Sequence, residues 1–168
     1  QTCALPISKL SKHEAGRPRT EDVAMKGGKE ITFEELAISP HVLKALRKEG
    51  FDIPSPIQAS AIPLGKFGVD IIAQAKSGTG KTVVFAVIIL ENIVLSQSGI
   101  QAMVIVPTRE LAVQIQGVLQ GLGQHLNEFV AHYFVGGLSL KEDIKKAERC
   151  HVAVGTPGRL KQMVEEGL

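Results

Sequence analysis

Near the middle of the chain, eight consecutive residues match the pattern of a phosphate-binding loop, with alanine in place of the first glycine. An apolar run of strand length, Val69 to Ala73, precedes this loop, and a helix-like segment follows it. Backbone N–H groups of such a loop wrap a phosphate, and the start of the next helix adds the positive end of its dipole. The context makes a chance match in a glycine-rich turn the weaker interpretation. The loop residues, all predicted to bind a nucleotide, are Ala75, Lys76, Ser77, Gly78, Thr79, Gly80, Lys81 and Thr82.

Two side chains of this loop carry the chemistry that a nucleoside triphosphate needs. Lys81 is placed to reach the β and γ phosphates, and the Thr82 hydroxyl is placed to bind Mg²⁺. We therefore predict Lys81 and Thr82 as catalytic residues and Thr82 as a metal ligand. A phosphate loop alone does not distinguish kinases, GTPases and motor ATPases.

Apolar runs of strand length alternate with helix-like segments along the rest of the chain. Such alternation is typical of βαβ units and a parallel sheet, and near-continuously apolar strands indicate that both faces of the sheet are covered. We predict an α/β layered fold. The strands are expected at Val69–Ala73, Ala102–Val106, Val130–Val135 and Val152–Val154, and the helices at Gly80–Leu95, Thr108–Leu122, Ser139–Glu148 and Pro157–Glu166.

Two shorter helices are expected upstream of the loop. Ser39 and Ser55 each stand before a proline, which is a typical helix start. Gln58 follows Ser55 by three residues and completes a capping box, and the same pattern recurs with Ser139 and Glu142.

Charge and cysteine content limit the function classes. The net charge is +2, and residues 31–168 hold thirteen basic and thirteen acidic side chains. Because no basic field covers the expected fold, any nucleic-acid contact must be local. Cys3 and Cys150 lie far apart and provide no metal-binding spacing, which favours a reducing compartment. The longest apolar run, Val83 to Leu90, is too short to span a membrane.

Five motifs in order resemble those of the DEAD-box ATP-dependent RNA helicases, over about residues 31–166. Gly50 to Gln58, with Phe33 seventeen residues before Gly50, resembles the family's Q motif. The phosphate loop is the second. The other three are Pro107 to Leu111 (motif Ia), Gly136-Gly137 (the GG element) and Thr156 to Arg159 (motif Ib).

This resemblance implies ATP as the nucleotide, Mg²⁺ as its metal, and a three-layer RecA-like domain with a mostly parallel sheet. It also implies that Gln58 recognises adenine and that Phe51 packs beside the base. Ile53 stands where many members have a polar residue, so any contact there is apolar or made by backbone. The alternative for Gln58 is a purely structural capping box, and both roles can hold together. Phe33 is either near the nucleotide or ordinary core.

The resemblance further implies RNA-backbone contacts with little sequence preference. The alternatives are helix caps, a surface ion pair and simple turns. A basic cluster on the Ser139–Glu148 segment favours a solvated helix face over an RNA contact. The residues implied to contact RNA are Pro107, Thr108, Arg109, Gly136, Gly137, Thr156, Pro157, Gly158 and Arg159.

We expect the chain to be part of a longer protein. The family's Asp-Glu-Ala-Asp segment is expected shortly after Arg159, and the chain ends before it. Residues 31–168 are therefore interpreted as a partial ATP-binding domain with a sheet incomplete at its C-terminal side, and residues 1–30 as a flexible or non-native leader. A fragment lacking the acidic segment and the second RecA-like domain is expected to be inactive alone.

Partners and location follow from the same resemblance. Ala61 to Gly65 and Gln74 to Gly78 resemble one subfamily that works in a ribonucleoprotein (RNP) complex, which implies RNP proteins as partners. The nucleus, the cytoplasm or both are implied, without a membrane. The alternatives are a P-loop NTPase that does not act on RNA and a non-catalytic nucleotide- or RNA-binding module.

Overall fold

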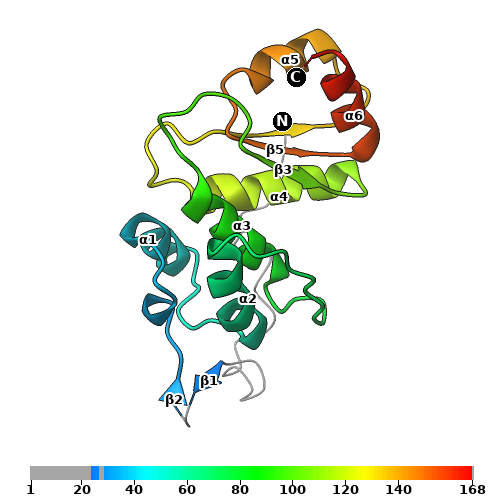
Figure 1. The fold of residues 1–168 in the computed structure, drawn as a ribbon. Coiled ribbons are helices and arrows are strands. Elements are labelled where there is room, and N and C mark those ends of the chain that lie inside the picture. The colour runs from blue at the N-terminus through cyan, green and yellow to red at the C-terminus, as the bar shows by residue number, and fades with distance from the viewer. Residues whose placement is uncertain (1–23, 27–28, 168) are drawn as a thin grey trace. The chain divides into compact units, whose positions relative to one another are not determined.

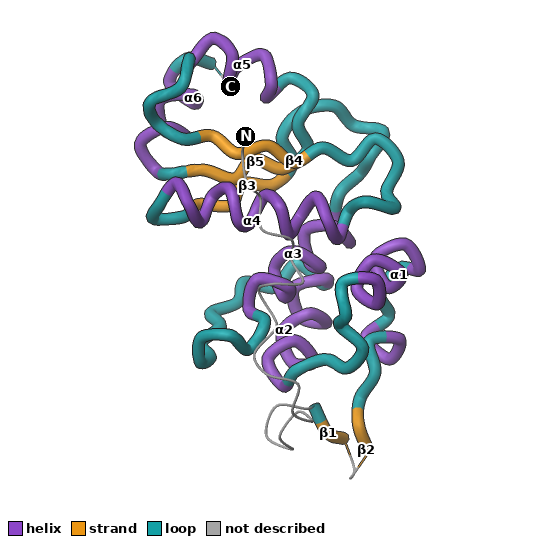
Figure 2. Tube along the Cα trace, turned by 180° about the vertical axis from the view of Figure 1, so that it is seen from behind, coloured by secondary structure: helices purple, strands orange, loops and turns teal. Residues whose placement is uncertain are grey.

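The computed structural model describes residues 24–26 and 29–167, which fall into two units (Figures 1 and 2). The helical unit comprises the described residues up to Asn92 together with Gly121–His125, and the sheet unit comprises Ile93–Gln120 and residues 126–167. Most of the predicted leader, residues 1–23 and 27–28, lies outside the described residues. The elements of the helical unit are β1 (Met25–Lys26), β2 (Lys29–Glu30), the 3₁₀ helix η3 (Glu34–Leu36), α1 (Pro40–Lys48), α2 (Pro56–Lys66) and α3 (Lys81–Asn92). Those that follow are β3 (Ala102–Ile105), α4 (Arg109–Leu122), β4 (Ala131–Phe134), α5 (Leu140–Ala147), β5 (Val152–Gly155) and α6 (Pro157–Glu165).

The sheet unit is a parallel three-stranded sheet in the order β3-β5-β4. Helix α4 covers one face of the sheet, and α5 and α6 cover the other (Figures 1 and 2). Every residue of the central strand β5 is buried, as expected for a strand with neighbours on both sides. The predicted α/β fold with a mostly parallel sheet covered on both faces is confirmed.

A small apolar core joins α5 and α6 to the sheet. Its buried residues come from β4, β5, both helices and the turn between α5 and β5; they are Phe134, Ala147, Cys150, Ala153, Leu160 and Met163. On the opposite side, the Gln116 side chain of α4 donates a hydrogen bond to the carbonyl of Ala131, at 2.8 Å. These contacts hold β4 and β5, from whose ends two of the sheet-unit loops emerge.

Close packing of α2 and α3 organises the helical unit. A Cβ on Gly65 would overlap the Ile88 side chain, so glycine is needed for this approach. The Glu91 carboxylate accepts a hydrogen bond from the Ser39 N–H at 3.0 Å and forms an ion pair with Lys66 at 2.9 Å. The phosphate loop therefore leads into a helix, α3, that is held by both α1 and α2.

The predicted strand at Val69–Ala73 is not formed. The segment has no regular secondary structure and pairs with no strand among the described residues, and Val69 and Ile72 are 53% and 103% exposed. An apolar run becomes a strand only when a neighbour satisfies its backbone groups and covers its side chains. The phosphate loop therefore follows an irregular, largely exposed segment.

Helices α1 and α5 begin where predicted, but the capping bonds at their starts differ from the prediction. Neither Ser39 nor Ser139 caps its helix through the hydroxyl. Glu142 is exposed, and the buried acid of that first turn is Asp143, whose carboxylate is paired elsewhere. The predicted capping box of α5 is thus wrong, because the turn is oriented by a tertiary contact.

Part of the segment predicted to be a flexible leader belongs to the helical unit. Strands β1 and β2 pair antiparallel, and the Ala24 N–H donates to the carbonyl of Pro54 at 3.1 Å. Ala24 is buried, and its carbonyl accepts the Ile31 N–H at 2.9 Å.

No helix among the described residues is both long enough and apolar enough to cross a membrane.

Candidate functional site

The phosphate loop adopts the tight backbone that its glycines permit. Gly78 and Gly80 both have φ of +83°, a region that other residues rarely occupy. The Thr79 hydroxyl donates to the carbonyl of Lys76 at 2.9 Å, which closes the turn internally. The Val83 N–H donates to the carbonyl of Gly80 at 3.0 Å, so the loop passes directly into α3.

Lys81 folds back over this loop. Its ammonium group donates to the carbonyls of Ala75 and Lys76 at 2.5 and 2.6 Å. The positive charge is thus already held at the loop rather than pointing into solvent. Thr82 follows in the first turn of α3 and is half-buried. The predicted catalytic pair thus lies at the junction of the loop and α3, and its role stays a prediction.

Gln58 connects the start of α2 to the phosphate loop. Its side chain is buried; its Oε1 accepts the Ser55 N–H at 2.8 Å, and its Nε2 donates to the carbonyl of Gly80 at 3.3 Å. The Ser55 hydroxyl donates to the carbonyl of Thr79 at 2.9 Å. The capping interpretation of Gln58 is confirmed, with a contact to the loop that sequence reasoning missed.

The adenine interpretation of Gln58 stays a prediction that the geometry permits. An amide side chain offers two donors and an acceptor with two lone pairs, and the contacts to Ser55 and Gly80 use one of each. Phe51 is half-buried and Ile53 is 39% exposed, both in the segment leading to α2. Phe33 is buried and belongs to the core of the helical unit.

The residues present fit a nucleotide with its metal. A Cβ on Gly80 would overlap the Gln58 amide, so this loop position requires glycine. The backbone of Gly80 therefore carries no side chain next to the phosphate loop's N–H groups. Loop N–H groups and the Lys81 ammonium suit phosphate oxygens, and the Thr82 hydroxyl suits Mg²⁺, which prefers oxygen ligands and binds together with phosphates. No cluster of three or more His, Cys, Asp or Glu side chains that could hold a metal occurs among the described residues.

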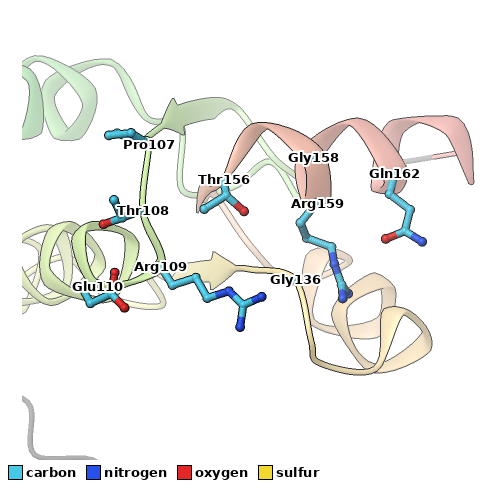
Figure 3. A pocket seen from close by; sticks show the side chains of 9 residues that line it. All are labelled: Pro107, Thr108, Arg109, Glu110, Gly136, Thr156, Gly158, Arg159 and Gln162. Carbon is cyan, nitrogen blue, oxygen red and sulfur yellow. The ribbon is translucent and has the colours of Figure 1, made fainter.

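The sheet unit holds a second candidate site, a hollow of about 550 Å³ at the carboxyl ends of the strands (Figure 3). In parallel sheets this edge is where ligands collect. The turns after β3, β4 and β5 all contribute to it. The lining residues are Pro107, Thr108, Arg109, Glu110, Gly136, Thr156, Gly158, Arg159 and Gln162.

Arg109 lies over the glycine pair. A Cβ on Gly137 would stand 3.3 Å from Arg109 Nη1, and one on Gly136 would stand 3.5 Å from Nη2. Figure 3 shows the Arg109 side chain extending toward Gly136. Arg109 itself is exposed, and the Thr108 hydroxyl accepts the Leu111 N–H at 3.3 Å, as predicted for a helix cap. The structure thus joins two of the predicted motifs through one guanidinium group.

Arg159 has a different environment from Arg109. Its Nη1 pairs with Asp143 Oδ2 at 2.7 Å, its Nη2 donates to the carbonyl of Leu138 at 2.6 Å, and both charged side chains are buried. Thr156 and Gly158 begin α6 beside it, with Gly158 and Pro157 exposed. The motif from Thr156 to Arg159 therefore also reaches the hollow, but the Arg159 guanidinium already has a carboxylate partner.

Two lining residues were not predicted from the sequence. Glu110 is exposed, and hydrogen bonds from its own backbone N–H and from the Thr108 hydroxyl lower the pKa of its carboxyl group. Gln162 is exposed on α6. Its spacing of four residues from Gly158 puts both on one side of the helix, and this spacing was the available signal.

Comparison with known proteins gives a family match and named relatives. The family model described as DEAD/DEAH box helicase matches residues 55–168. The mouse protein named "Probable ATP-dependent RNA helicase DDX20", also known as Gemin3, is 44% identical over 164 residues, which is 98% of this chain and 20% of that protein. The Arabidopsis thaliana protein named "DEAD-box ATP-dependent RNA helicase 8" is 44% identical over 153 residues, covering 90% of this chain and 30% of that protein.

A solved structure shows the same fold. The crystal structure of a DEAD box protein from the hyperthermophile Methanococcus jannaschii matches with a TM-score of 0.77 and 35% identity, over 81% of this chain and 37% of that one. The chain spans 20% to 30% of the length of the two curated relatives named above.

Proposed function

Because this chain belongs to the DEAD/DEAH box helicase family, we propose that it supplies ATP binding and RNA-backbone contacts to an ATP-dependent RNA helicase. The observation that carries the proposal is the bond from Gln58 to Gly80, which joins a candidate adenine-reading amide to the phosphate loop. The described geometry supports a nucleotide lying along α2 and α3 of the helical unit. In the whole protein, ATP hydrolysis is coupled to RNA duplex opening or RNP remodelling.

On this proposal, the chain's own groups divide the work of holding the nucleotide. Loop N–H groups and the dipole of α3 bind phosphate oxygens, and the Lys81 ammonium group moves from the carbonyls of Ala75 and Lys76 to the β and γ phosphates. Thr82 provides a hydroxyl ligand for Mg²⁺, which neutralises charge on the transferring phosphate when bound. Phe51 and Ile53 contribute apolar surface near the base.

RNA binding belongs to the hollow of the sheet unit. The exposed Arg109 guanidinium supplies charge, and the bare backbone at Gly136-Gly137 and the start of α6 at Thr156-Pro157-Gly158 admit a ribose-phosphate chain. The hollow presents no aromatic side chain among its lining residues, so contacts to the backbone rather than base stacking support binding with little sequence preference.

The wider setting follows from the same proposal. Residues 31–168 act as part of an ATP-binding domain that works with a second RecA-like domain, and RNP proteins are partners. Such an activity operates in the nucleus, the cytoplasm or both. The chain alone is proposed to be inactive in hydrolysis.

The direct test is Lys81→Ala in the full-length protein. We expect ATP affinity to fall at least tenfold and RNA-stimulated ATP hydrolysis to be lost, because the loop loses the ammonium group that it holds at the carbonyls of Ala75 and Lys76. Lys44→Ala, at an exposed position of α1, is the matched control and should change neither quantity. Unchanged ATP binding in the Lys81 variant would exclude the phosphate loop as the site. If RNA does not stimulate ATP hydrolysis by the parent protein, the protein is an NTPase that does not act on RNA.

A further inference from the structure

The buried ion pair between Asp143 and Arg159 links two of the turns of the hollow, the one after β4 and the one after β5. Asp143 lies in the first turn of α5, and Arg159 lies in the first turn of α6. The Arg159 guanidinium also holds the carbonyl of Leu138, the residue that follows the glycine pair. Asp143 is fully buried and Arg159 is 7% exposed, so this cluster is closed to solvent.

We propose that Asp143 and Arg159 are positioning residues for RNA binding and that Arg109 is the arginine that meets the phosphate. The pair fixes the Gly136–Leu138 turn against the start of α6, which holds the glycine backbone beneath the Arg109 guanidinium. This inference rests on the proposed RNA site. It assigns Asp143, which no sequence motif pointed to, and it changes the role expected for Arg159.

Arg159 and Arg109 differ in whether a carboxylate neutralises the charge of the guanidinium group. A carboxylate oxygen 2.7 Å from Arg159 Nη1 satisfies much of that guanidinium's charge. Moving Arg159 outward to a phosphate would leave the Asp143 carboxylate buried without a partner, which is strongly unfavourable. Arg109 is exposed and lines the same hollow, and its guanidinium lies beside the side-chain-free Gly136 and Gly137 rather than against a buried carboxylate.

The geometry of the pair favours positioning over stability. Desolvation offsets most of the attraction in a buried ion pair, so such a pair is weak support for stability. In addition, Asp143 Oδ1 and Arg159 Nε are buried and have no hydrogen-bond partner among the described residues. The pair leaves these two polar atoms without a partner, but it holds the Leu138 carbonyl. Its role is therefore to fix the Gly136–Leu138 turn rather than to add stability.

The test measures the affinity of the full-length protein for a labelled single-stranded RNA across a series of salt concentrations. Each lost phosphate contact on a single strand lowers the salt slope of log affinity by about 0.7. We expect this decrease for Arg109→Gln. For Asp143→Asn and Arg159→Met we expect RNA affinity to fall by roughly tenfold with an unchanged slope, because the turn moves while the phosphate-binding cation remains.

Two controls separate positioning from a general loss of folding. Lys145→Gln, on the exposed side of α5, should keep the affinity, and ATP affinity should be retained in every variant. If Asp143→Asn unfolds the protein, the neutral pair Asp143→Asn with Arg159→Met removes both buried charges and takes its place. That double variant should also bind RNA more weakly with the slope of the parent protein.

The outcomes that overturn the inference differ from those that overturn the proposed function. A slope decrease in Arg159→Met equal to that in Arg109→Gln would make Arg159 a phosphate ligand. Unaltered RNA affinity in the folded Asp143 or double variant would exclude positioning. If the parent protein binds no RNA, or if Arg109→Gln changes nothing, the RNA site itself is wrong.

Discussion

At the residue scale, Gly80 is the position where the phosphate loop is least tolerant of change. Its φ of +83° disfavours any side chain, and an added Cβ would overlap the Gln58 amide. We expect Gly80→Ala to lower the free energy of unfolding by about 1–3 kcal/mol and to weaken ATP binding, because the loop must shift. Chemical denaturation and calorimetric titration with ATP measure the two effects.

Gly117→Ala is the matched control for this loop substitution. Gly117 lies inside α4, and a Cβ there would meet no atom within 4 Å. Alanine at such a helical position should stabilise the protein by about 0.5–1 kcal/mol. A Gly80 variant that binds ATP as tightly as the parent would show that the Gln58–Gly80 contact is dispensable.

The Gln58 side chain allows the two interpretations of its role to be separated by nucleotide choice. If the amide reads the adenine edge, Gln58→Ala should remove the preference for ATP over GTP, because the distinguishing hydrogen bonds are lost. If it acts only through Ser55 and Gly80, both affinities should fall by the same factor. Competition titrations with the two nucleotides give this ratio, and we expect the preference to be lost.

At the scale of elements, the sheet unit buries Cys150 between β5 and α5. The thiol donates to the carbonyl of Val152 at 3.0 Å, and burial raises its pKa, so the protonated form is retained to higher pH than in the unfolded chain. The corresponding stability is complete below the unfolded thiol's pKa and is lost as the pH rises above it. We therefore expect the unfolding free energy to decrease at strongly alkaline pH.

Thiol labelling tests this burial directly. In a Cys3→Ser background, Cys150 should react with a soluble alkylating reagent only as fast as the sheet unit opens. The reaction should accelerate across the denaturation midpoint. Rapid labelling under native conditions would contradict the packing of α5 and α6 on the sheet.

Local signals predicted the elements best where the physics is local. The helices that begin at Pro40 and Pro56 were predicted from a serine followed by proline. Strands β3, β4 and β5 were predicted from their apolar runs, and α6 from its place after the last of them. The strand at Val69–Ala73 failed because pairing depends on a neighbour rather than on composition. The motif positions placed Arg109 and Gly136 correctly at one hollow.

What the sequence could not predict depends on contacts between distant residues. Asp143 and Arg159 are sixteen residues apart, and nothing in either local pattern indicates that they pair. Likewise, Gln58 reaches Gly80 across twenty-two residues. A motif identified Gln58, Gly80 and Arg159 but not Asp143, and the tertiary fold decided whether each side chain meets a ligand or another part of the protein.

At the scale of the whole chain, strand β3 is an edge of the sheet as far as residues 24–26 and 29–167 show. Within these residues its one hydrogen-bonded neighbour is β5, and the side chains of Met103 and Ile105 are 42% and 62% exposed. A free edge with apolar side chains is a template for pairing with another strand. We expect this 168-residue chain to self-associate as its concentration rises, and Ile105→Lys to suppress association with little effect on stability.

Sedimentation velocity over a concentration series measures this association. Val164→Lys is the matched control, because Val164 is 54% exposed on α6 and lies on no strand edge. The substitution lowers the surface hydrophobicity as Ile105→Lys does, but it leaves the edge of β3 unchanged. The Val164 variant should therefore associate like the parent chain. If both lysine variants suppress association equally, the contact is non-specific rather than at β3. A monodisperse parent chain at all concentrations would show that the edge is protected, and the exposed faces of Met103 and Ile105 would then need another explanation.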